Sequence, residues 1–283
     1  QAFKAPNNWR LNDDGTLTNV IETEEYRQAI EYQVAMFQDG AFHPDSASMT
    51  FADSQNTFIA GGTGLHYEGT TSFFGVGNVG YRQQQANPDA RLDNVPIIAV
   101  DGGPGVTHNN PGYFGYVGIP ASVGGDEERV MELLRILDYL NSPFGSEEQL
   151  FLGNGIEGVH FEFNEMGAPI VNDLGRQERG DLVYLMGSLN VLFYPTEPEV
   201  GLQVQEVLKE TVEVGIDDPT LVLYSQTNID QGPILGQLGM DSITPIVTGR
   251  DSIDALDAAI EAWRSQGGDQ MRQEYEQALQ EQG

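Results

Sequence analysis

The chain has 283 residues, of which 43 are acidic and 13 are basic, so its formal net charge at pH 7 is −30. A surface of this charge repels phosphate, which excludes binding to nucleic-acid backbones and binding to anionic lipid through a basic patch. The sequence has no cysteine, which excludes disulfides, thiolate zinc sites and cysteine nucleophiles. No stretch approaches the ~18 consecutive apolar residues of a membrane span, and the length fits one large domain or two small ones.

The first third of the chain predicts short helices separated by glycine-rich turns. Residues 23–39 have apolar residues at helical spacing, a threonine that can cap the N-terminus, and Gly40 behind the last turn. Residues 53–60 predict a second short helix, which ends at a glycine-rich stretch. Residues 65–69 and 95–100 have patterns typical of buried strands.

The remainder of the chain is mostly helical in its pattern. The clearest helix is predicted at residues 126–141, where one apolar stripe follows a cluster of acidic residues. Residues 113–120 and 220–224 predict strands. The other predicted helices lie at 147–152, 181–193, 199–212, after a cap at Asp251, and at 270–281. The sequence therefore predicts a mixed α/β fold with more helix than strand.

The common catalytic and nucleotide-binding motifs are absent from the sequence. It contains no Gly-x-Ser-x-Gly elbow, no Walker loop and no His-Glu-x-x-His. The spacing of the four histidines, His43, His66, His108 and His160, is not that of a zinc site. We therefore predict no metal site.

Carboxylates and aromatic rings outside the charged helix faces are candidates for ligand contacts. Glu68 and Glu157 each lie among glycines and aromatic residues. There a carboxylate can accept hydrogen bonds from sugar hydroxyls while a ring covers the apolar face of the sugar, although a strand-end or helix-cap role is the alternative. Aromatic residues in loop-like stretches fit either a ligand cleft or a small core beneath the loops; they are Tyr67, Phe73, Phe74, Tyr81, Tyr113, Phe114 and Tyr116.

Four segments, in the same order along the chain, resemble the bacterial extracellular solute-binding proteins of family 1, in the lipoprotein branch that serves carbohydrate ABC transporters. The segment that carries most of the resemblance is Leu134-x-x-Leu-Asp-Tyr-Leu140, followed by Gly-Asn-Gly-Ile-Glu-Gly-Val-His-Phe at 153–161. Asn154 lies near a position where the family commonly has Tyr, and Phe161 replaces the Tyr that ends the family's motif. The other segments are Gly-Ala-Phe-His-Pro-Asp at 40–45, Phe-Ile-Ala-Gly-Gly-Thr-Gly-Leu at 58–65, where Gly62 replaces the usual Lys, and Ala-Trp-x₃-Gly-Gly-Asp-x₄-Glu-Tyr at 262–275.

The resemblance implies a fold of the periplasmic-binding-protein type II, with two α/β lobes joined by a hinge and a sugar or oligosaccharide held between them. It implies an incomplete chain, the C-terminal portion of a lipidated precursor. Residues 1–112 would then belong mainly to the C-terminal lobe, 113–170 would carry the hinge strand and part of the other lobe, and 171–283 would return to the first lobe and end in helices. Closure of the lobes on the ligand would present the protein to its permease.

The resemblance also implies a receptor and not an enzyme, with no catalytic residues and no cofactor. It implies a monomer at the cell surface or outside the cell, anchored by a lipidated N-terminus that this chain does not contain, with transmembrane permease subunits as partners. A glycoside hydrolase and a surface interaction domain stay open as alternatives, as do a peptide or a polyamine as ligand. The candidate ligand-binding residues are Glu68, Phe73, Phe74, Tyr113, Glu157 and His160.

The acidic surface yields a first prediction. Only two of the basic residues, Lys4 and Lys209, are lysines, a composition that suits a salty or extracellular medium. Because like charges repel in the folded state, added NaCl should screen them and raise the melting temperature. Thermal unfolding across a series of NaCl concentrations measures this effect, and a melting temperature that does not respond to salt would contradict it.

Overall fold

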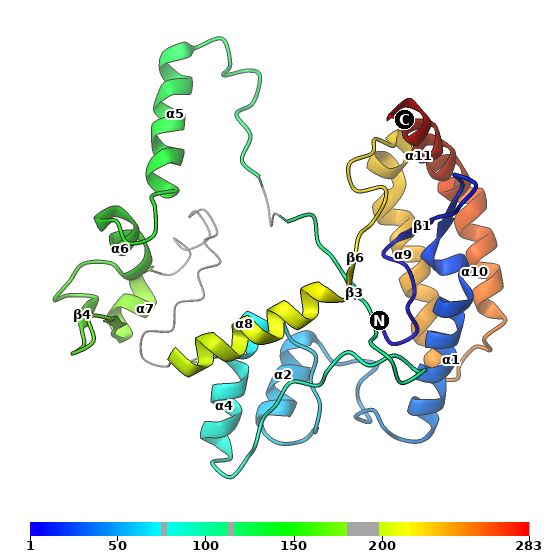
Figure 1. The fold of residues 1–283 in the computed structure, drawn as a ribbon, viewed down its shortest axis with the longest axis horizontal. Coiled ribbons are helices and arrows are strands. Elements are labelled where there is room, and N and C mark those ends of the chain that lie inside the picture. The colour runs from blue at the N-terminus through cyan, green and yellow to red at the C-terminus, as the bar shows by residue number, and fades with distance from the viewer. Residues whose placement is uncertain (75–77, 113–115, 180–197, 283) are drawn as a thin grey trace. The chain divides into compact units, whose positions relative to one another are not determined.

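The computed structural model describes residues 1–74, 78–112, 116–179 and 198–282. The chain forms two compact units, which we call the first unit (residues 1–111 with 206–283) and the second unit (residues 112–205). Helices dominate both units, and the strands of the described residues form three two-stranded pairs (Figure 1). In the described part of the chain, no helix has the length and apolar character to cross a membrane.

The elements of the first unit come from both ends of the chain. Its α-helices are α1 (Glu24–Gln38), α2 (Phe51–Ile59), α3 (Thr70–Phe73), α4 (Val79–Ala86), α9 (Gln226–Val247), α10 (Ala255–Trp263) and α11 (Asp269–Gln282). The unit also contains the 3-10 helix η1 (Val20–Glu22) and the π-helical segment η3 (Arg264–Gly268). Its strands are β1 (Trp9–Leu11), antiparallel to β2 (Leu17–Asn19), and β3 (Thr107–His108), parallel to β6 (Gly215–Ile216).

The second unit is smaller and has one antiparallel strand pair. Its helices are α5 (Glu127–Leu140), α6 (Glu147–Asn154) and α7 (Asp173–Arg179), and its strands are β4 (Phe161–Phe163) and β5 (Pro169–Val171). In that pair Phe161 lies opposite Val171. The boundary between the two units falls within α8 (Pro198–Glu213).

Helix α9 is the centre of the first unit, since α1, α10 and α11 all pack against it (Figure 1). It contributes to two buried hydrophobic clusters. Ile246 lies with Ile30 and Leu256, which joins α9 to α1 and α10. The larger cluster joins both ends of the chain: Trp9, Leu17, Leu235, Trp263, Met271 and Tyr275.

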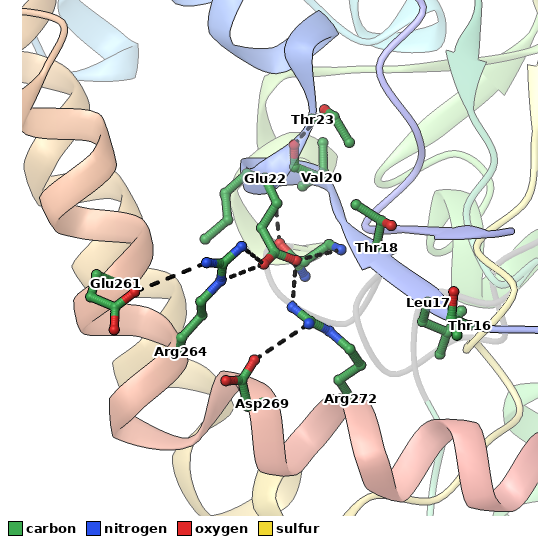
Figure 2. Close-up of polar contacts among 12 residues, drawn as sticks. Thr16, Leu17, Thr18, Val20, Glu22, Thr23, Glu261, Arg264, Asp269 and Arg272 are labelled. Atoms are coloured by element: carbon green, nitrogen blue, oxygen red, sulfur yellow. Dashed lines mark hydrogen bonds and ion pairs between the residues drawn. The ribbon is translucent and has the colours of Figure 1, made fainter.

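The side chain of Glu22 ties the N-terminal hairpin to the C-terminal helices. It is only 5% exposed and accepts hydrogen bonds from Arg264 Nε at 2.7 Å and from Arg272 Nη2 at 2.5 Å. Figure 2 shows the carboxylate between the two guanidinium groups, with Glu261 and Asp269 on their outer sides. A buried charge is stable only when it is paired and hydrogen-bonded, so both arginines are needed to stabilise the Glu22 carboxylate at this position.

Glu274 of α11 connects that helix to the start of α9. Its carboxylate accepts hydrogen bonds from Ser225 Oγ at 2.6 Å, from the Thr227 N–H at 2.9 Å and hydroxyl at 2.8 Å, and from Gln270 Nε2 at 3.1 Å. Burial by itself raises the pKa of this carboxyl group, but the hydrogen bonds outweigh it and lower the pKa from 4.5 to about 2.

Most of the predicted helices are confirmed. Those at 23–39, 53–60, 126–141, 147–152, 199–212 and 270–281 have ends shifted by one or two residues. The helix predicted at 181–193 lies outside the described residues. Helix α10 begins after Asp254, and not at a cap on Asp251 as predicted.

Three predicted strands are wrong. At 65–69 the side chains of His66 and Glu68 bond to α2, and the backbone pairs with no strand. At 95–100 a tight turn allows only one β-bridge, from Ile98 to Pro104. At 220–224 the carboxylate of Asp218 binds Thr220 and holds a turn. For 113–120, residues 116–120 are irregular and the rest lies outside the described residues.

The contacts of Glu22 predict a large loss of stability for a substitution that keeps the size and shape of its side chain. Replacing Glu22 by Gln leaves two arginines without their shared anion and should lower the free energy of unfolding by about 2 kcal/mol, since both arginines keep partial access to water. Urea denaturation measures it. The matched control is Glu261→Gln, because Glu261 is 76% exposed at 4.0 Å from Arg264. Equal effects of the two substitutions would contradict the assignment.

The low pKa of Glu274 predicts a pH dependence of stability. Its pKa is lower in the folded chain than in the unfolded chain, so its contribution is complete above pH 4.5 and is lost as the pH falls toward about 2. Glu274→Gln should therefore be less stable than the unsubstituted chain at pH 7, and the difference should shrink between pH 4.5 and 2. Urea unfolding across this range measures it, with Glu281→Gln on the same helix as control. A difference that stays constant with pH would contradict this prediction.

Candidate functional site

An open cavity of about 720 Å³ lies in the first unit, within the usual size range of small-molecule sites. One wall follows α2 and includes α3, and another comes from the segment after α4. The third comes from β3 and α8, so distant parts of the sequence meet here. Its lining segments are 64–70, 73–74, 91–97 and 107–108, with Phe58 and with Val207, Glu210, Thr211 and Val214 of the third wall.

Aromatic rings form part of the first wall. The ring of Phe58 lies 6.1 Å from that of Phe73, which meets the ring of Phe74 edge-on at 5.2 Å. Helix α4 packs closely behind them, because a Cβ on Gly80 would lie 2.9 Å from the carbonyl oxygen of Phe73 and 3.1 Å from its ring. Glycine at this position therefore allows the close approach that fixes the Phe73 ring.

His66 and Glu68 are buried beside these rings, with 3% and 9% of their side chains exposed. The imidazole of His66 stacks on Phe58 at 5.5 Å, and its Nδ1 lies 3.3 Å from the hydroxyl oxygen of Ser54. Its Nε2 lies 3.7 Å from a carboxylate oxygen of Glu68 and has no hydrogen-bond partner among the described residues. This ring nitrogen is therefore a buried polar atom with unused hydrogen-bonding capacity.

The carboxylate of Glu68 is held from both sides. One oxygen accepts the N–H of Gly69 at 2.8 Å, and the other accepts Gln55 Nε2 at 2.9 Å. Gln55 in turn accepts a hydrogen bond from Arg82 of α4 at 3.4 Å. The orientation of Glu68 is thus set by α2 and α4 together, before any ligand binds.

The third wall is fixed by contacts between β3 and α8. The hydroxyl of Thr107 donates to the carbonyl oxygen of Thr211 at 2.7 Å, and His108 Nε2 lies 3.1 Å from the carbonyl oxygen of Ala5. Glu210 adds a carboxylate to this side of the cavity. Rings on one wall and oxygen acceptors on two walls suit a ligand with apolar faces and many hydroxyl groups.

Three of the six predicted ligand-binding residues line this one cavity: Glu68, Phe73 and Phe74. Tyr113 lies outside the described residues. Four further residues line the cavity but were not among the predicted ligand-binding residues: His66, Arg91, Asp93 and Glu210. For Glu210 no local signal existed, because it is one of several acidic residues on α8, far along the chain from the other lining segments.

Glu157 and His160 belong to the second unit and are not among the lining residues of the cavity in the first unit. His160 Nδ1 accepts the N–H of Ile156 at 3.0 Å, and its Nε2 lies 2.9 Å from a carboxylate oxygen of Glu178. Both ring nitrogens are therefore engaged in local structure. In the described part of the chain, no group of three or more histidine and acidic side chains could hold a metal ion.

Comparison with known proteins points to binding proteins. No protein-family profile matches the chain. It is 23% identical to lipoprotein LipO of Bacillus subtilis (strain 168), over 95% of the chain and 54% of LipO. It is 22% identical to the polygalacturonan/rhamnogalacturonan-binding protein YtcQ of the same organism, over 97% of the chain and 54% of YtcQ. The chain thus spans about half the length of these curated relatives.

Among solved structures, the chain is similar to the alginate-binding protein AlgQ2, solved without calcium ion. The TM-score is 0.58 at 12% sequence identity, over 98% of this chain and 61% of AlgQ2. This similarity establishes the fold, a mixed α/β fold of the kind found in that binding protein. Two of the three proteins are named for a polysaccharide that they bind and one as a lipoprotein, and none is named as an enzyme.

Proposed function

We propose that this protein binds a sugar or oligosaccharide in the cavity of the first unit and releases it unchanged. The proposal depends on one observation above all: the buried carboxylate of Glu68 lies in the same cavity wall as the rings of Phe58 and Phe73. A sugar ring presents C–H groups on its faces and hydroxyls at its edge, so it needs both kinds of group side by side.

The geometry of Glu68 favours hydroxyl recognition. An ionised carboxylate oxygen can accept two hydrogen bonds, and each oxygen of Glu68 accepts one from a neighbouring protein donor. One acceptor position on each oxygen therefore stays free for a ligand hydroxyl. Because the carboxylate is already held in place, the ligand does not bear the cost of ordering it.

The names of the similar proteins support this ligand class. YtcQ is named for binding polygalacturonan and rhamnogalacturonan, and AlgQ2 for binding alginate. We extend the proposal to a receptor at the cell surface that delivers its sugar to an ABC permease, as the family resemblance of the sequence implies. Within that role the site performs no chemistry, and the glycoside hydrolase alternative predicts cleaved products instead.

Sugar binding predicts a thermal shift. A ligand present at 100 times its dissociation constant should stabilise the folded chain by ~2.7 kcal/mol. The screen should include neutral monosaccharides and oligosaccharides of polygalacturonan, rhamnogalacturonan and alginate. For a neutral sugar, Phe73→Ala and Glu68→Gln should each weaken binding by about tenfold or more, through loss of a ring contact or of a charged acceptor.

The matched control for this screen is Tyr224→Ala, since Tyr224 is 63% exposed and does not line the cavity. It should bind as the unsubstituted chain does. The bound sugar should be recovered intact. No stabilisation by any sugar, an equal loss in the control, or recovery of cleaved sugar would each contradict the proposal.

A further inference from the structure

The charged side chains that line the cavity are mostly negative. Its carboxylates come from three separate segments: Glu68 after α2, Asp93 in the segment after α4, and Glu210 of α8. Arg91 lines the cavity as well, but its Nη1 donates to the main-chain carbonyl oxygens of the two residues before it, at 3.3 and 3.1 Å. One guanidinium group, partly bound to its own backbone, therefore stands against three carboxylates.

The other cations of the first unit have partners away from the cavity. All 13 lysines and arginines of the chain belong to the described residues, and among them Arg91 alone lines the cavity. Arg82 and Arg250 donate to neutral side chains. The remaining six in this unit form ion pairs with acidic partners: Lys4, Arg10, Arg27, Lys209, Arg264 and Arg272.

The other ionisable groups of the lining residues do not reverse this balance. His66 and His108 count as neutral at pH 7 in the formal charge of the chain. Gln1 also lines the cavity, and burial lowers the pKa of its α-amino group, which therefore loses its charge at a lower pH than a free amino group does. Even with this amino group charged, three carboxylates face two cations.

Glu68 presents its negative charge directly beside the aromatic wall. Both of its hydrogen-bond donors, Gln55 Nε2 and the N–H of Gly69, are neutral groups. The imidazole of His66, with Nε2 at 3.7 Å, lies beyond hydrogen-bond distance. Because the Glu68 side chain is only 9% exposed, water and salt screen its charge less than they screen a surface charge. A ligand carboxylate at this wall would therefore meet a repulsion that solvent weakens little.

We infer that the cavity selects saccharides without carboxylate groups and rejects uronates. The inference rests on the proposed function and deepens it by naming the class of sugar. Uncharged hydroxyls satisfy the acceptors of Glu68, and C–H faces satisfy the rings, whereas a uronate adds a like charge to a site that already holds three. Each unit of polygalacturonan or alginate carries such a carboxylate.

A matched pair of sugars tests this on the 283-residue chain. Oligogalacturonate and its methyl ester have the same hydroxyl groups and differ in the charge at C6. Isothermal titration calorimetry, with a chelator present so that no divalent cation bridges carboxylates, should give a dissociation constant at least about tenfold higher for the uronate. If the ester does not bind, the pair becomes the neutral oligosaccharide that binds in the thermal screen and its form oxidised to a carboxylate at C6.

Two further measurements separate charge from shape. Added NaCl should lower the ratio of the two dissociation constants, uronate over neutral sugar, because salt screens repulsion but does not change a steric fit. Glu210→Gln should lower the same ratio by about threefold or more, since it removes one repelling charge. The matched control is Glu206→Gln, which removes the same charge from α8 at a residue that does not line the cavity, and it should leave the ratio unchanged.

The outcomes distinguish this inference from the proposed function. A uronate that binds as tightly as its neutral counterpart, or more tightly, would overturn the inference and leave sugar binding intact. A preference for the neutral sugar that responds to neither NaCl nor Glu210→Gln would also overturn it, because the cause would then be steric. Binding of no sugar of either class would contradict the proposed function, and the inference with it.

Discussion

The pairing of the buried Glu22 carboxylate with two arginines is the interaction on which the first unit depends. It links η1 to Arg264 and Arg272, which lie 242 and 250 residues further along the chain. In the same unit the ring of Trp9 packs against that of Trp263 at 5.9 Å. The N-terminal segment fixed in this way reaches the cavity. Asn7 Nδ2 donates to the carbonyl oxygens of Asn109 and Ile216, at the ends of β3 and β6. The wall that carries Thr107 and His108 is therefore anchored by the same contacts that join the two ends of the chain.

Local signals in the sequence predicted much of the helical content and little of the rest. The helix at 126–141 was predictable because Asp126 caps it and acidic residues begin it. Helix α9 was not predicted, because Pro233 and Pro245 interrupt its pattern. It forms because burial of Leu235 and Ile246 outweighs the local cost. Strand predictions failed where side-chain hydrogen bonds or tight turns replaced backbone pairing, which depends on contacts distant in sequence.

The candidate site, like the fold, was predictable from the sequence only in part. Glu68, Phe73 and Phe74 were predictable because they lie close together in one loop-like stretch, whereas Glu210 reaches the cavity only through the packing of α8. His160 shows the opposite limit. The place of His160 in a family-like motif suggested a ligand contact. Its ring supports a turn instead, because the backbone at Gly155, with φ +87°, lies very close to the imidazole. Motif position alone could not separate these two roles.

The central claim is that the rings and the carboxylate of one cavity wall hold a sugar. Saturation-transfer difference NMR tests it most directly, because irradiation of aromatic protons transfers magnetisation only to ligand protons in contact with the protein. With an oligosaccharide selected by binding, the account predicts strong transfer to the C–H protons of the sugar faces, with the transfer reduced in Phe73→Ala and retained in Tyr224→Ala. Transfer that is absent, or that is unaffected by loss of the Phe73 ring, would contradict it.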